Sequence, residues 1–168
     1  MQPGVDESFS HFLGRFRRAN HLSHQTLAQV MCELEGKSHG VGEVGLNARI
    51  IEAWEMPSRR CQPSASQLEI LAQLSQLEVT QLSALLPGAA ITFATRLCSQ
   101  CYRDEPIHRL SWQVGDCGFC GEHHCRLLSE CPGCKTALRL PSLWAVGRCE
   151  YCWLGFEQMG DYGGIDCE

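Results

Sequence analysis

Eight cysteine and histidine residues in the C-terminal half are spaced as the ligands of two metal ions. They form pairs with two residues between the members: Cys98 with Cys101, Cys120 with His123, Cys131 with Cys134, and Cys149 with Cys152. Two donors at this spacing sit on one tight turn and point at a single ion, so each pair supplies half of a four-ligand site. The pattern predicts two zinc ions, because zinc takes thiolate and imidazole donors in a tetrahedron.

Disulfide bonds are the competing interpretation, since the chain has 12 cysteines in 168 residues. The first residues contain no basic segment followed by an apolar one, and no later stretch is long enough to span a membrane. We therefore expect a cytoplasmic protein with no membrane contact, in which paired thiols stay reduced and hold metal.

One ligand position stays open in the first site. Two residues separate Cys117 from Cys120, as two residues separate Cys98 from Cys101. By spacing alone, Cys117 can therefore replace Cys120 or His123 as a ligand. Cys32, Cys61, Cys125 and Cys167 have no partner at ligand spacing.

The elements that must position these ligands differ between the two halves of the chain. The N-terminal half has apolar residues at helical spacing, among them Phe9, Phe12, Leu13, Phe16, then Leu27, Val30, Met31, Leu34, then Leu46, Ile50, Ile51, Trp54. Asn20 is expected to end the first helix and Ser23 to cap the second. Ser64 with Gln67 predicts a capping box for a later helix, and Leu82, Leu85 and Leu86 predict a short one before Pro87.

The order of helices over residues 23–86 resembles the repressor-type helix-turn-helix group. In that arrangement a third helix presents Asn47 and Arg49 to base edges in the major groove. Two carboxylates on the same helix, Glu52 and Glu55, would repel phosphate. Residues 36–45 are rich in glycine and are expected to form an insertion, much longer than the usual turn.

A change in composition marks the domain boundary. Pro87-Gly88 ends the helical pattern, and from Cys98 onward cysteine, glycine and tryptophan replace leucine and glutamine. We expect a linker near residues 87–95. The predicted fold is a small helical helix-turn-helix domain over residues 1–90, a first zinc ribbon over 91–128, and a second zinc ribbon with an acidic tail over 129–168.

Charge and site chemistry limit the function. The formal net charge is −5, opposite to that of most nucleic-acid binders, so any contact with nucleic acid must be local. The candidates are the basic side chains that face away from the first apolar stripe, with an arginine pair after the third helix: His11, Arg15, Arg17, Arg18, Arg59 and Arg60. A closed four-ligand site leaves no position for a reactive water, so we expect no enzyme activity.

A combination of motifs spans nearly the whole chain. It consists of Glu7-Ser8-Phe9-x2-Phe12-Leu13-x-Arg15-x4-Asn20-x-Leu22-Ser23, then Arg96-Leu97-Cys98-x2-Cys101, Arg109-x2-Trp112-Gln113, Cys120-x2-His123 and Leu127-Leu128-x2-Cys131-Pro132-x-Cys134. The combination resembles the TniQ family of transposition proteins, in particular the short form found in type V-K CRISPR-associated transposons. Family spacing from the tryptophan implies Cys120 and His123 as the second half of the first zinc site.

The resemblance implies a bacterial adaptor without catalytic activity. In this family a helix-turn-helix domain and zinc ribbons couple target recognition to TnsC, a AAA+ ATPase that polymerises on DNA. In the type V-K system the target is recognised by a CRISPR effector with its guide RNA. The expected partners are therefore TnsC, whose assembly this protein would nucleate or cap, and the effector complex, with local contact to RNA. The alternative is a sequence-specific DNA-binding protein that selects a target or regulates transcription.

Overall fold

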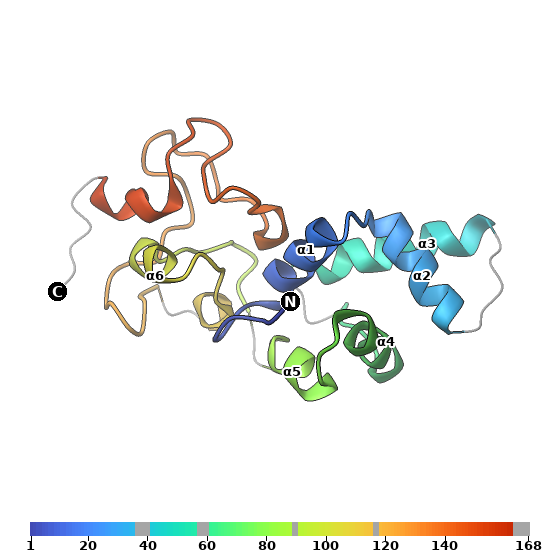
Figure 1. Cartoon of the computed structure of the whole chain (residues 1–168). Helices are drawn as coiled ribbons and strands as arrows, with labels where there is room; N and C mark the ends of the chain where they lie inside the picture. Colours follow the sequence, from blue (N-terminus) through green and yellow to red (C-terminus); the bar gives the residue numbers. More distant parts are fainter. Residues whose placement is uncertain (36–40, 57–60, 89–90, 116–117, 163–168) are drawn as a thin grey trace.

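The computed structural model describes residues 1–35, 41–56, 61–88, 91–115 and 118–162. We call residues 1–88 the helical half and residues 91–162 the cysteine-rich half. The helical half contains α1 (Phe9–Ala19), α2 (His24–Leu34), α3 (Val41–Trp54), α4 (Ala65–Ser75) and α5 (Val79–Ala84). The cysteine-rich half contains α6 (Ser99–Asp104) and the short 3-10 helices η1 (Leu110–Gln113), η2 (Pro141–Leu143) and η3 (Phe156–Asp161) (Figure 1).

The predicted caps at Asn20, Ser23 and Ser64 are confirmed. Asn20 is the C-cap of α1, and the Ser23 hydroxyl accepts a hydrogen bond from the Thr26 amide at the start of α2. The Ser64 hydroxyl accepts from the Gln67 amide while the Gln67 side chain accepts from the Ser64 amide, which completes the capping box of α4. These side chains satisfy backbone N–H groups that have no partner within the helix.

Two expectations for α2 and α3 were wrong. Leu34, placed on the apolar stripe of α2, is 45 % exposed, whereas Met31, one turn earlier, and Leu27, two turns earlier, are buried in the core. The helix α3 begins at Val41 and takes in Gly42 and Gly45, which the sequence analysis assigned to an insertion. Packing of α3 against α2 outweighs the low helix propensity of these glycines.

The core of the helical half is formed by α1 to α5 together. Its buried residues include the whole predicted stripe of α1, with Leu27, Met31, Ile51, Trp54, Leu71 and Leu82 from the other helices. Arg17 of α1 pairs with Glu55, which follows α3, at 2.7 Å, and His24 of α2 approaches the same carboxylate at 3.1 Å. These contacts hold α1 across the α2–α3 pair.

The described residues form no sheet. The cysteine-rich half has isolated antiparallel bridges in place of ribbon strands, as at Phe119 with Arg126 and at Glu130 with Ala137. One hydrophobic cluster runs through the regions of both predicted zinc modules. It joins Leu97, Cys98, Cys101, Tyr102, Trp112 and Cys120 to Cys131, Trp144, Cys149, Phe156 and Met159. The two metal-site regions therefore share a single core.

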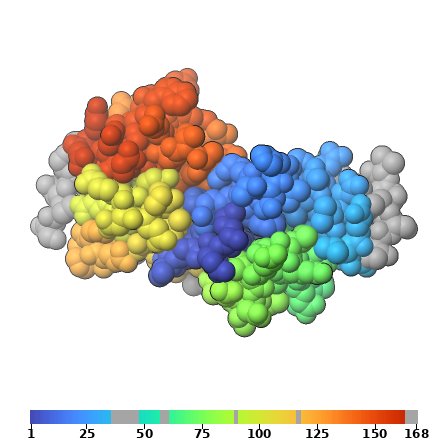
Figure 2. Space-filling view, viewed as in Figure 1, coloured from blue at the N-terminus to red at the C-terminus, as the bar shows by residue number. Residues whose placement is uncertain are grey.

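The N-terminal segment and α1 connect the two halves. The Ser8 amide donates to the His108 carbonyl at 2.8 Å, and the Leu110 amide donates to the Asp6 carbonyl at 2.7 Å. Helix α1 packs against η2, and Gly14 allows this close approach because a Cβ there would overlap the Ser142 backbone. The dark blue N-terminal residues lie at the junction in the space-filling view (Figure 2).

Candidate metal centres

The predicted ligands of the second site lie together in space. The Sγ atoms of Cys131 and Cys152 are 3.4 Å apart, and those of Cys134 and Cys149 are 3.5 Å apart. All four sulfur atoms lie within 4.8 Å of one another. The sequence thus identified the members of this cluster correctly.

The distances fit ligation of one ion. Four thiolates at about 2.3 Å from a tetrahedral metal have sulfur atoms roughly 3.8 Å apart, whereas a disulfide joins them at about 2.05 Å. The observed separations of 3.4 and 3.5 Å are close to the first value. No disulfide joins the cysteines within the described parts of the chain.

The backbone around the donors repeats one turn three times. In each case the amide of the residue after the second donor donates to the carbonyl of the first donor: His124 to Cys120, Lys135 to Cys131 and Trp153 to Cys149, at 2.8 to 2.9 Å. These three residues have left-handed φ angles of 52°, 62° and 65°. We call each such turn a knuckle. The turn places two donors, with two residues between them, on the same side of the chain.

A second repeated hydrogen bond closes each knuckle. The amide of the first donor donates to the carbonyl five residues later: Cys120 to Cys125, Cys131 to Thr136 and Cys149 to Leu154, at 2.8 to 2.9 Å. Because Cys120 and His123 occupy the two donor positions of a complete knuckle, the geometry assigns them as a half-site. Cys117, the rival ligand, lies outside the described residues.

The first site combines one knuckle with the start of a helix. Cys98 is the N-cap of α6, and its Sγ accepts from the Cys101 amide one turn later. The sequence analysis expected a tight turn here, so the helix is a correction. The Cys101 Sγ lies 3.5 Å from the Cys120 Sγ and 3.2 Å from the His123 Nδ1, and all four predicted donors are within 4.8 Å of one another.

Neighbouring side chains orient the donors of the first site. The His123 Nε2 lies 3.6 Å from the Asp104 carboxylate, which leaves the Nδ1 facing the sulfur atoms. Glu122 lies 3.3 Å from the Cys101 Sγ and pairs with Arg109. A carboxylate on the far nitrogen of a ligating histidine fixes the ring and its tautomer. The sequence signal for Arg109 was its place in the Arg-x2-Trp-Gln motif.

One thiol in each site has a low pKa. Burial raises the pKa of Cys120, but hydrogen bonds from the His123 and Glu122 backbone outweigh it and lower the pKa to about 7. The Thr136 hydroxyl and backbone lower the pKa of Cys134 to about 6. Since the thiolate is the form that binds metal, each site offers a ready first ligand near neutral pH.

The basic side chains predicted to contact partners are largely engaged within the protein. His11 is 1 % exposed, so its placement on an open face was wrong; the cysteine-rich half covers it, and its ring contacts that of Trp144. Arg17 is 11 % exposed and pairs with Glu55. Arg15 is 30 % exposed and pairs with Glu7, and Arg18 donates to the Ser142 carbonyl. Arg59 and Arg60 lie outside the described residues.

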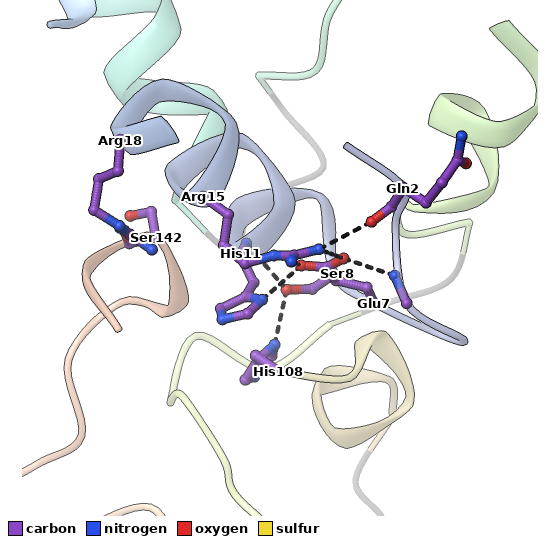
Figure 3. Close-up of polar contacts among 9 residues, drawn as sticks. Gln2, Glu7, Ser8, His11, Arg15, Arg18, His108 and Ser142 are labelled. Carbon is purple, nitrogen blue, oxygen red and sulfur yellow. Dashed lines mark hydrogen bonds and ion pairs between the residues drawn. The ribbon is translucent and has the colours of Figure 1, made fainter. Parts of the chain in front are cut away.

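A buried carboxylate that the sequence analysis missed organises this junction (Figure 3). Glu7 is fully buried and accepts from the Gly4 amide, lies 2.6 Å from the His11 Nδ1 and pairs with Arg15 at 2.7 Å. Ser8 reaches the His108 Nδ1 at 2.8 Å. The spacing of Glu7, His11 and Arg15 at four-residue intervals was the available signal, because it places all three on one side of the chain entering α1.

An apolar cleft opens beside the second metal site. Its volume is about 170 Å³, and its lining includes Leu138, Leu143, Val146, Trp153 and Phe156. Trp153, the residue after the ligand Cys152, is 66 % exposed, and Val146 is 70 % exposed. Exposed apolar side chains gathered around a cleft are typical of a protein contact surface.

Searches for known relatives add no identification. No protein-family model matches this chain, and no curated protein matches it. In the part of the chain that the structure describes, no helix combines the length and apolar character needed to cross a membrane.

Proposed function

We propose that this protein is a non-catalytic adaptor of RNA-guided DNA transposition, as its resemblance to TniQ implies. It links a CRISPR effector and its guide RNA to the AAA+ ATPase TnsC, and it nucleates or caps TnsC assembly. The observation that supports this best is the pair of four-donor clusters that brace one core, with an exposed apolar cleft at their edge. Such a body offers a rigid surface for partners.

The proposed metal at both sites is zinc. Thiolate and imidazole donors in a tetrahedral set favour zinc, and four protein ligands leave no position for a water molecule. The ions are therefore structural and support folding of the cysteine-rich half. Metal analysis of purified protein should find two zinc ions per chain, and a value near zero would refute the assignment.

We interpret the helical half as a helix-turn-helix domain used for protein contact. Helix α3 carries Glu52, whose side chain is 59 % exposed, beside the exposed Arg49. An exposed carboxylate on this helix disfavours the phosphate backbone of DNA. This charge arrangement supports an adaptor over a protein that reads a DNA sequence directly.

We assign the apolar cleft to contact with TnsC. A tryptophan at the rim of an apolar cleft is a common source of binding energy in protein interfaces. Arg148 also lines this cleft, and no ion pair of Arg148 is found among the described residues, so it is open to a carboxylate of the partner.

The test is TnsC binding by Trp153→Ala, with Phe93→Ala as the matched control. Phe93 is also exposed, at 79 %, and does not line the cleft. We expect Trp153→Ala to weaken TnsC binding about 30-fold, the effect of losing a hot-spot contact of about 2 kcal/mol. Phe93→Ala should bind as the wild type does. Equal binding by both variants would remove the cleft from the interface.

A gel shift separates the adaptor from the alternative function. Tight binding of the isolated protein to one DNA sequence, falling steeply with salt, would favour a sequence-specific DNA-binding protein. Retention by TnsC without such binding would favour the adaptor.

A further inference from the structure

The residue five positions after the first donor of each knuckle faces the metal cluster. In the second site Thr136 has this position, and its hydroxyl lies 3.3 Å from the Cys134 Sγ. Leu154 has it in the other knuckle, where its methyl group lies over Gly133 between two ligands. In the first site the same position is held by Cys125. The chain thus places a fourth thiol, and a fifth potential donor, where its other knuckles place a supporting side chain.

Cys125 lies beside Cys98, one of the four donors of the first cluster. Its Sγ lies 3.5 Å from the Cys98 Sγ, and the His123 Nδ1 lies 3.7 Å from that same sulfur. Cys125 is 5 % exposed, whereas the His123 side chain is 25 % exposed. A thiol and an imidazole therefore stand beside the same ligand, and the thiol is the better shielded of the two.

We propose that Cys125 is an alternative fourth ligand of the first metal site. The site can then close with three thiolates and the His123 imidazole, or with the four thiolates of Cys98, Cys101, Cys120 and Cys125. In the exchange the bond from metal to His123 nitrogen breaks, and a bond from metal to Cys125 sulfur forms. The thiol proton passes to the released imidazole or to solvent. This inference depends on metal binding at the first site, as proposed above.

Metal stoichiometry tests the exchange directly. The variants are His123→Ala, Cys125→Thr and both together; threonine is chosen because Thr136 holds the equivalent position in this chain. Native mass spectrometry counts the ions in protein loaded with zinc. We expect two ions in the wild type and in each single variant, and one in the double variant. The ion that remains in the second site shows that the double variant is folded there.

Cobalt reports the ligand set. In cobalt-loaded His123→Ala, the first site should have four thiolates where the wild type has three. Because the second site contributes four thiolates in both proteins, the thiolate-to-cobalt charge-transfer absorbance of the whole protein should rise by about one seventh, from seven bound thiolates to eight. A single ion in His123→Ala, or two in the double variant, would overturn the proposal.

A measurement on a conservative variant is independent of His123. Threonine keeps a small polar side chain at this position but cannot replace a released His123 as a metal ligand. Cys125→Thr should therefore lose the ion of its first site to a chelator faster than the wild type does, and equal rates would count against Cys125. Fewer than two ions in the wild type would refute the metal assignment and this inference together. Failure to bind TnsC would leave the ion counts unaffected, so the adaptor proposal fails separately.

Discussion

At the scale of single residues, the most consequential group is a carboxylate buried between the two halves. Glu7 loses its hydration in this position, which by itself raises its pKa; hydrogen bonds from His11 and Arg15 outweigh that effect, so the pKa lies below its ordinary value. A buried charge of this kind is tolerated only when its partners are present. Glu7 therefore ties the N-terminal segment to α1 and to the surface of the cysteine-rich half.

Glu7→Gln is expected to destabilise the protein by about 3 kcal/mol, because it removes the buried charge to which His11 and Arg15 are hydrogen-bonded. Urea unfolding followed by circular dichroism measures this change. Glu69→Gln is the control: Glu69 is exposed on α4, and its replacement should change stability by less than about 0.5 kcal/mol. A Glu7→Gln effect as small as that of the control would show that the network contributes little.

Acid should loosen the same junction. Because the pKa of Glu7 is lowered in the folded protein, its carboxylate stabilises the fold at neutral pH. This stabilisation is lost as the pH falls through the folded-state pKa of Glu7. Burial also lowers the pKa of His108 well below 6.5, so the folded state keeps this ring neutral while the unfolded state binds a proton. Stability should therefore fall progressively below about pH 6.5. A flat profile from pH 7 to 4 would contradict this.

At the scale of elements, α1 serves as the shared part of two packing systems. Its apolar side enters the helical core with Phe9, Phe12 and Phe16, while Gly14 and Arg18 contact η2 of the cysteine-rich half. The face predicted to be open to partners is thus mostly an internal contact. Partner binding by Arg15 and Arg18 remains a prediction for the parts of these side chains that are exposed.

Gly14→Ala tests the packing of α1 on η2, because its effect on stability should be opposite to that of the same change in an ordinary helix. Alanine in place of glycine inside a helix normally stabilises by about 1 kcal/mol. At Gly14 the added methyl group overlaps the Ser142 backbone, so we expect destabilisation by about 1 to 3 kcal/mol. Thermal unfolding measures the difference. Gly118→Ala, where a Cβ meets no atom of the described residues within 4 Å, is the control and should be close to neutral. Stabilisation by Gly14→Ala would show that α1 does not dock on η2.

At the scale of the whole molecule, the two halves differ in what holds them together. The helical half has a core of aliphatic and aromatic side chains, whereas the cysteine-rich half packs Trp112, Trp144 and Phe156 around the metal ligands. Among the described residues, its regular structure is limited to short helices and isolated bridges. The proposed ions must therefore supply much of the free energy that folds this half.

Chelation should unfold the cysteine-rich half first. After removal of metal, hydrogen exchange measured by mass spectrometry should show lost protection over residues 97–159. Protection should also be lost over residues 4–8, because the Ser8 amide donates to the His108 carbonyl of the cysteine-rich half. Protection in α2 and α4 should remain, because their core contains no metal ligand. Readdition of zinc is the control and should restore protection. Unchanged exchange after complete metal removal would contradict a structural role for the ions.

The sequence by itself determined what depends on local order along the chain. Caps, apolar stripes and paired donors act over two to eight residues, so the end of α1 at Asn20, the Ser64 capping box and the eight clustered donors followed from spacing. Tertiary structure decided what depends on contacts between distant residues. Packing of the cysteine-rich half on α1 buries His11 and Glu7, and packing against α2 accompanies the extension of α3 through two glycines. The fold of the cysteine-rich half brings Cys125 to Cys98. None of these follows from local order, because burial and close approach are set by a surface that is distant in the sequence.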